Sequence, residues 1–374
     1  YHLWSEVYDS DLEDVFQIQD EISLKIVNKL KENLSLGQQP TPEHIVKPLT
    51  ENIDAYNLYL KGRYYFNKSN PENIQKAIQT FEEVIRIDPE FASTYCMLSF
   101  CYSFLGSSGL MHPVEAYSKA KDYTLKAIEI DPNHAESHLS LATIKFYNNW
   151  DFEGAEASLN KAINLGLNSS LLNQVHGWFL IAKGDFNQAI EKTEQAVILD
   201  PLSLPLMSQL ADAYAFAERF EDALAQYDKV LELDPSFRRG YEGKGYCYLA
   251  MKDYEKAIEY LDKYQKLIGH PLKGNSSLGH AYAAAGHHDK ALECLDRIKQ
   301  RQESEPNVVL DMDFAFIYSG FKDYDKAFHY LNRVYENRTG IACLGMIFCI
   351  RYPMLNELKS DVRFKQLTTK IGIE

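Results

Sequence analysis

Apolar residues recur along most of the chain with the spacing of helices that pack on one face. The pattern is plainest at 222–235, DALAQYDKVLELDP, where a small, an aromatic and an apolar residue follow one another as Ala223, Tyr227 and Val230. Residues three and four apart share one face of a helix, and alanine lets a neighbouring helix approach closely. This stretch is therefore predicted to be a helix that packs against a partner helix.

Degenerate copies of this stretch return at nearly constant intervals. The copies begin at Lys76, Lys119, Gly154, Gln188, Asp222, Lys256, Lys290 and Lys326. The intervals between them are 43 and 35 residues, then four of 34 residues, and finally 36 residues. Four copies end in Asp-Pro, with the prolines at Pro89, Pro132, Pro201 and Pro235. Proline donates no amide hydrogen and disfavours a helical conformation in the residue before it. Each of these helices is therefore predicted to end at its Asp-Pro.

A second apolar pattern precedes each copy and predicts a first helix. Its core runs apolar, small, any, any, aromatic, as in Leu210, Ala211 and Tyr214, and it recurs within 277–286 and 313–320. At these residues the chain resembles the tetratricopeptide repeat, a helix–turn–helix unit with a period of about 34 residues. The resemblance covers roughly 55–337. It implies an all-α fold, a right-handed superhelical solenoid of about eight helix–turn–helix repeats.

The insertion in the second unit is predicted to lengthen the turn between its helices. It adds about nine residues within 106–117, GSSGLMHPVEAY, relative to the 34-residue interval. Loop insertions are tolerated because their entropic cost grows slowly with length.

The first fifty residues differ in pattern from the repeats. YHLWSEVYD alternates bulky and polar residues as a strand does, and a helical pattern and a Pro-rich linker follow. This opening resembles the closing strand and helix of a TolB-type amino-terminal module, which in bacterial proteins often joins tetratricopeptide repeats to a class III nucleotide cyclase or a winged-helix domain. We therefore expect a TolB-type remnant plus linker at 1–50, eight repeats at 51–338 and capping helices at 339–374. Since the chain begins without Met, we expect it to be a fragment.

Charge and cysteine content narrow the class of protein. The net charge of −14 disfavours nucleic-acid binding, which depends on Lys and Arg neutralising phosphates. The longest uncharged apolar stretch, 340–350, is shorter than the ~20 residues that span a bilayer, so no membrane span is expected. Cys96, Cys101, Cys247, Cys294, Cys343 and Cys349 form no C-x-x-C pair and mostly fall at apolar positions. We expect a cytoplasmic location, with the extracytoplasmic side of a membrane-anchored parent as the alternative.

No catalytic or metal-binding pattern stands in the chain. H-E-x-x-H, G-x-x-x-x-G-K-[ST], G-x-G-x-x-G and G-x-S-x-G are all absent from the sequence. His134 and His138 have helical spacing but no third ligand nearby in sequence, so a solvated or capping role is favoured. We expect this chain to be non-catalytic and to bind no cofactor or metal, although a longer parent protein could be an enzyme.

One position of the first helix faces the concave groove in the repeat family that the chain resembles. The eight units place there Arg63, Phe100, Thr143, Trp178, Asp212, Tyr246, His280 and Phe316. Exposed aromatic patches tend to mark interaction sites. We therefore expect Phe100, Trp178, Tyr246, His280 and Phe316 to form a partner-binding groove. The alternative is that packing between repeats, or a terminal segment, covers these rings. The linker and first helix are the segment most able to do so.

These patterns favour a non-catalytic protein-interaction or sensory scaffold that binds a peptide or partner segment in its groove. The alternative is the regulatory C-terminal region of a class III adenylate or guanylate cyclase, or of a winged-helix transcription regulator. The sequence leaves the partner and the oligomeric state open.

Overall fold

A computed structural model describes residues 49–68, 70–108, 110–305, 308–337 and 350–373. These residues are mostly helical and include no strand. The chain divides into two compact units, 1–98 and 99–374, and the division falls inside helix α4 (Ala92–Ser107). The region with the TolB-type resemblance lies outside the described residues.

The described part of the first unit is built around one helix pair. Helix α2 (Ile53–Asn67) packs against α3 (Pro71–Ile87), with the rings of Tyr59 and Phe81 5.9 Å apart. The Thr50 hydroxyl, just before α2, donates a hydrogen bond to the Asp88 carboxylate that ends α3. This bond joins the start of the first helix to the end of the second.

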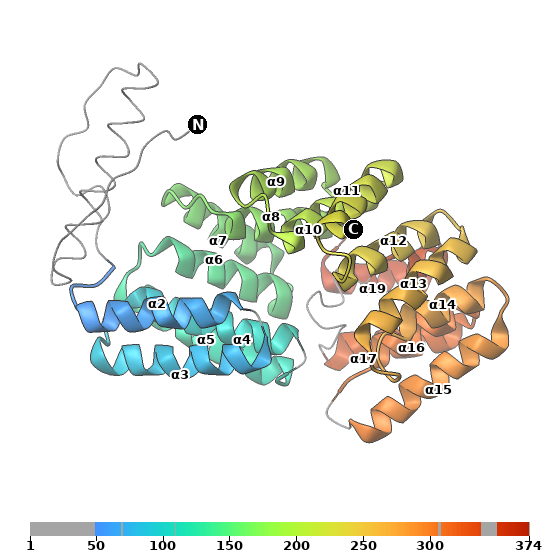
Figure 1. The fold of residues 1–374 in the computed structure, drawn as a ribbon, viewed down its shortest axis with the longest axis horizontal. Helices are drawn as coiled ribbons and strands as arrows, with labels where there is room; N and C mark the ends of the chain where they lie inside the picture. The colour runs from blue at the N-terminus through green and yellow to red at the C-terminus, as the bar shows by residue number, and fades with distance from the viewer. Residues whose placement is uncertain (1–48, 69, 109, 306–307, 338–349, 374) are drawn as a thin grey trace, which may run out of the picture. The chain divides into compact units, whose positions relative to one another are not determined.

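The second unit continues the pairing along the chain (Figure 1). After α4 come α5 (Pro113–Ile130), α6 (Ala135–Ile144) with the π-helix η2 (Lys145–Asn149), α7 (Phe152–Asn164), α8 (Ser170–Lys183), α9 (Phe186–Leu199), α10 (Leu204–Phe216), α11 (Phe220–Leu233), α12 (Arg238–Ala250), α13 (Tyr254–Ile268), α14 (Ser276–Ala284), α15 (His288–Ser304), α16 (Asp311–Gly320) and α17 (Tyr324–Asn337). The described residues thus contain eight helix pairs. The predicted all-α solenoid of paired helices is confirmed for this part of the chain.

Small residues set the distance between the paired helices. The alanine at the second place of every copy is 0% exposed, namely Ala77, Ala120, Ala155, Ala189, Ala223, Ala257, Ala291 and Ala327. A Cβ atom at Gly245 would lie 2.6 Å from Leu261 Cγ of the paired helix α13, and one at Gly279 would lie 2.9 Å from Cys294 Cβ of the paired helix α15. A larger residue at these positions would force the helices apart.

The recurring aromatic residue of the first helix packs against a cation that opens the second helix. The cation lies 4.6–5.4 Å from the ring centre in the pairs Tyr102/Lys119, Tyr214/Arg219, Tyr248/Lys256, Tyr282/Lys290 and Tyr318/Lys326. A cation at this distance is attracted to the face of the ring. These tyrosines therefore have a structural role in the repeat.

The turn inside each later pair uses a left-handed residue followed by a cap. The left-handed positions are Trp150, Gly184, Glu218, Lys252, Gly286 and Lys322, with φ between 55° and 83°. In four of these turns the next residue is an aspartate whose side chain accepts from a main-chain N–H of the following helix; these are Asp151, Asp185, Asp253 and Asp323. The remaining two turns have Arg219 and His287, which make no side-chain cap bond.

The structure corrects the expectation for the insertion in the second unit. Helices α4 and α5 have 16 and 18 residues, against 13 and 14 in α10 and α11. Most of the insertion therefore extends the helices, and only the remainder lengthens the turn. The interval of 35 residues before Gly154 is accommodated differently, because η2 holds an extra residue as one π-helical turn.

The helix caps predict that removing a single hydrogen-bond acceptor changes the stability of the chain. Asp185→Ala removes the acceptor for the Gln188 N–H and should cost about 1 kcal/mol of unfolding free energy, whereas Asp185→Asn keeps an acceptor and should cost little. His287→Asp should stabilise the chain, since it supplies a cap that α15 lacks. Urea unfolding followed by circular dichroism measures all three. Equal losses in the Ala and Asn variants would show that the cap contributes nothing.

Candidate functional site

The candidate site is the face of the first helices that carries the predicted groove residues. Trp178 lies on α8, Tyr246 on α12, His280 on α14 and Phe316 on α16. Tyr246 and His280 are each 8% exposed and Phe316 is 0% exposed. We call this surface of α8, α10, α12, α14 and α16 the first-helix face.

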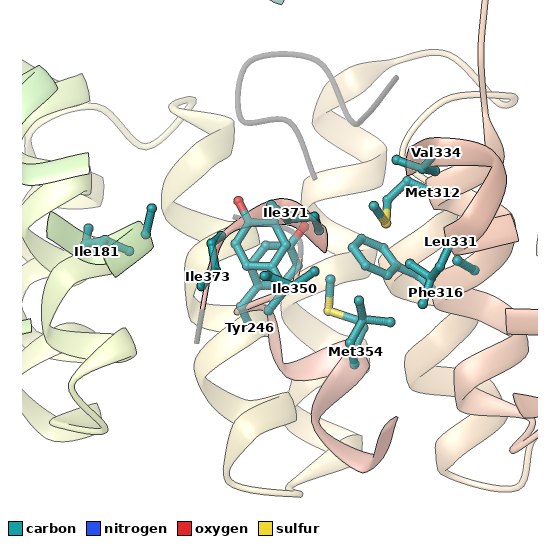
Figure 2. Close-up of a cluster of buried hydrophobic side chains, with 14 of the residues drawn as sticks. Ile181, Tyr246, Met312, Phe316, Leu331, Val334, Ile350, Met354, Ile371 and Ile373 are labelled. Atoms are coloured by element: carbon teal, nitrogen blue, oxygen red, sulfur yellow. The ribbon is translucent and has the colours of Figure 1, made fainter. Parts of the chain in front are cut away.

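The C-terminal residues of the chain cover this face. Residues 350–373, here called the tail segment, contain the 3-10 helix η3 (Pro353–Leu358) and helix α19 (Val362–Ile371). Helix η3 contacts α12 and α16, and α19 contacts α17. Figure 2 shows Ile350, Ile371 and Met354 between Ile181 on one side and Phe316 on the other. The tail segment thus shares one apolar core with the repeats.

Tyr352 is the main aromatic anchor of the tail segment. Its ring centre lies 5.1 Å from that of Tyr246, 5.9 Å from Phe216 and 6.3 Å from Phe316. Tyr352 is 4% exposed. Such aromatic contacts add to the free energy gained by removing each ring from water.

Polar contacts fix the position of the tail segment. The Ser319 hydroxyl donates to the Met354 carbonyl at 2.7 Å, and Arg351 Nη2 donates to the Ala182 carbonyl at 2.9 Å. Further along, Arg363 Nη1 lies 2.7 Å from the Asp325 carboxylate. The Ser319 bond uses a main-chain carbonyl of the tail segment, which any segment of similar shape would present.

The five predicted groove residues fall into two groups. Tyr246, His280 and Phe316 come together beneath the tail segment, and the His280 Nδ1–H donates to the Phe316 carbonyl at 2.9 Å. Trp178 is half-buried and packs against the same core, whereas Phe100 on α4 is half-buried and lies outside it. The linker and first helix, which the sequence favoured as a cover, lie outside the described residues. Contact of these five residues with a partner stays a prediction.

A network of charged groups lies beside Tyr246. Arg239 donates to Asp212 at 2.7 Å and to Glu242 at 2.6 Å, and Asp212 also accepts from the Tyr227 hydroxyl. The Tyr246 hydroxyl donates to Glu242 at 3.0 Å. Asp212 lies at a predicted groove position, but its carboxylate is already bound by Arg239 and Tyr227 of the same chain.

A cavity of about 170 Å³ separates the tail segment from the repeats. Aromatic rings line it, from Phe186, Phe216, Phe220, Tyr227, Tyr246 and Tyr352. Its charged lining residues are Asp212, Glu218, Arg351 and Lys359. Arg351, Tyr352 and Lys359 were not predicted from the sequence, because residues beyond the repeats cannot be aligned with any repeat position.

The described side chains can be compared with the requirements of metal binding and of a reactive thiol. No group of three or more His, Cys, Asp or Glu side chains is placed to hold a metal ion in the parts of the chain that the structure describes. Burial raises the pKa of Cys247 to about 12 and that of Cys294 to about 11. A reactive thiol requires the opposite shift. No helix in the described ranges is long and apolar enough to cross a membrane.

The comparison with family models agrees with the helix pairs. Residues 208–270, from α10 to α13, match the tetratricopeptide repeat. This part of the chain carries the tetratricopeptide repeat. Repeats of this kind form scaffolds for protein–protein interaction.

Two curated relatives resemble this chain over part of its length. The transcriptional regulator HilA of Salmonella typhimurium is 26% identical over 205 residues, which is 54% of this chain and 35% of HilA. The putative adenylate cyclase 3 of Rhizobium meliloti is 30% identical over 143 residues, 38% of this chain and 24% of the cyclase. The matched regions therefore span about a third or less of these relatives.

A solved structure shares the fold. Human IFIT1, determined as a dimer with m7Gppp-AAAA, has a TM-score of 0.55 and 16% sequence identity, covering 86% of this chain and 78% of IFIT1. At this identity the likeness shows the fold alone.

Tyr352 provides a test of the packing. Tyr352→Ala removes the ring that lies between Tyr246 and Phe316, and it should cost about 3–5 kcal/mol, while Tyr352→Phe keeps the ring and should cost less than about 1.5 kcal/mol. Hydrogen exchange should rise at residues 350–359 in the Ala variant only. Unchanged exchange there would contradict the anchoring role.

The burial of His280 predicts that the unfolding free energy of the chain depends on pH. Burial lowers the pKa of His280 to about 4, below its ordinary value of 6.5. The unfolded chain therefore takes up the proton first, so stability is full above about pH 6.5 and falls by roughly 3 kcal/mol as the pH drops to about 4. His280→Gln can still donate to the Phe316 carbonyl but does not titrate. Its unfolding free energy should fall less over this range; parallel profiles would contradict the assignment.

Proposed function

We propose that the chain is a protein-interaction region whose first-helix face binds a short segment of a partner protein. The observation that carries the proposal is the tail segment itself. Residues 350–359 lie on α12 and α16 through an aromatic anchor, apolar side chains and a hydrogen bond to a main-chain carbonyl. Grooves in peptide-binding domains use the same combination, in which the main chain provides affinity and side-chain pockets provide specificity.

A partner can bind the first-helix face only by displacing part of the tail segment. Its buried apolar side chains are Ile350, Tyr352, Met354, Leu355, Leu358, Phe364, Leu367, Ile371 and Ile373. Burying a large apolar side chain contributes about 1.5–3 kcal/mol relative to exposure, so the whole segment is held firmly. A partner segment would therefore replace residues 350–359, while α19 stays in place. Trp178 and Phe100, which remain half-buried, are the proposed contacts beyond the tail segment.

A second proposal concerns the parent protein. The partial similarity to HilA and to a putative adenylate cyclase supports a regulatory region joined to an output domain, either a winged-helix transcription regulator or a nucleotide cyclase. On this view the first-helix face receives the signal and the output domain responds. The coding sequence upstream of Tyr1 distinguishes the two output domains.

The partner-binding proposal is tested with a fluorescent peptide that carries the sequence of residues 350–360. The Tyr352→Ala chain, whose own segment is weakened, should bind this peptide saturably in an anisotropy titration. The wild-type chain should not, because its tethered segment has an effective concentration of about a millimolar. A peptide in which Tyr352 is replaced by Ala should bind weakly.

The control is Val362→Ala, which changes an exposed residue of α19. It should behave like the wild type. If the Tyr352→Ala chain keeps its helical circular dichroism and fails to bind the peptide, the first-helix face is not a peptide-binding surface.

A further inference from the structure

The cavity between the tail segment and the repeats is lined by aromatic rings and by charged side chains of both signs. Its rings come from both sides, with Phe216 and Tyr246 from the repeats and Tyr352 from the tail segment. Arg351 and Lys359, both in the tail segment, provide the positive charge. Neither makes an ion pair within 4.0 Å with any carboxylate in the described ranges.

Arg351 has a hydrogen-bond donor without an acceptor among the described residues. Its Nη2 donates to the Ala182 carbonyl, but its Nε is buried and has no acceptor among the described atoms. Buried donors are nearly always paired, because an unpaired one loses its bond to water without replacement. Burial also lowers the pKa of Arg351, which shows that its charge is poorly compensated.

The carboxylates at the cavity do not supply the missing partner. Asp212 already accepts from Arg239 and from Tyr227, and Glu218 is exposed. Burial and the charge of Arg351 lower the pKa of Lys359, and Glu218 opposes them with a smaller effect. Lys359 is exposed like Glu218, so Arg351 is the half-buried charge at the cavity that no carboxylate in the described ranges offsets.

We propose that this cavity binds a small aromatic carboxylic acid. The ring would lie among the aromatic side chains, and the carboxylate would accept from Arg351 and Lys359. The cavity volume of about 170 Å³ suits one six-membered ring with a short acid, since an apolar cavity of about 150 Å³ holds benzene. Arginine is well suited to this role because its planar donors match a carboxylate.

Ligand binding would strengthen the docking of the tail segment. Arg351, Tyr352 and Lys359 belong to that segment, whereas Phe186, Phe216 and Tyr246 belong to the repeats, so a ligand between them contacts both. Anything that binds only the docked arrangement shifts the equilibrium towards it. The acid would thereby oppose partner binding at the first-helix face. This consequence rests on the proposed function, but the ligand site does not.

Calorimetry of the full chain with four matched probes tests the site. Phenylacetate has both the ring and the charge, phenylacetamide and benzyl alcohol have the ring, and acetate has the charge. Phenylacetate should bind with a submillimolar to millimolar dissociation constant, and the other three at least about tenfold more weakly, because each lacks one of the two contacts. Arg351→Gln and Lys359→Gln should each weaken phenylacetate binding, the former by about tenfold or more.

Lys365→Gln is the matched control, since Lys365 is an exposed lysine of the tail segment that does not line the cavity. It should bind phenylacetate as the wild type does. Phenylacetate should also slow hydrogen exchange at residues 350–359. Equal binding of phenylacetamide, unchanged affinity in both the Arg351 and Lys359 variants, or no binding by phenylacetate below about 10 mM would each overturn the proposal and leave a cavity filled by water. These results are independent of peptide binding by the Tyr352→Ala chain. The ligand-site proposal can therefore be wrong while the partner-binding proposal is right, and the reverse.

Discussion

The close approach of two helices at a small residue is the contact on which the structure depends. The alanine that opens each second helix is fully buried, and the glycines opposite, such as Gly245 and Gly279, leave no room for a Cβ atom. Pairs built in this way bury their apolar sides only against neighbouring pairs. Each first helix therefore keeps a surface that the repeat itself does not cover. Where that surface carries Tyr246 and Phe316, it must be covered by something else.

The tail segment covers that surface and adds long-range contacts to the array of repeats. In a simple solenoid each repeat contacts only its neighbours, so stability is nearly a sum of local terms. Here Arg351 bonds to the Ala182 carbonyl across 169 residues, and the rings of Trp150 and Tyr335 are 5.6 Å apart. These contacts join early and late pairs of the second unit. Loss of the tail segment should therefore weaken several pairs at once.

The repeats could be predicted from the sequence because their signals are local and repeated. Alanine at Ala223, the aromatic position at Tyr214 and the Asp-Pro stop at Pro235 each follow from spacing or backbone chemistry within one unit. The longer helices α4 and α5 were not predicted. The length of an insertion is known from the sequence, but that length alone does not show whether the added residues extend a helix or a turn. The same limit applies to the tail segment. Tyr352 meets Tyr246 and Phe316 by long-range packing, and no periodicity links those three positions.

Burial under the tail segment also constrains how the candidate site can work. If residues 350–359 left the first-helix face with nothing in their place, Tyr246, Phe316 and Tyr352 would all become exposed together. A contiguous apolar surface of that kind is rare on soluble proteins and costs free energy in proportion to its area. An empty face is therefore a poorly populated state. Exchange of one segment for another keeps the rings covered throughout, so a partner that resembles the tail segment at its aromatic anchor meets a smaller barrier than one that needs an open groove.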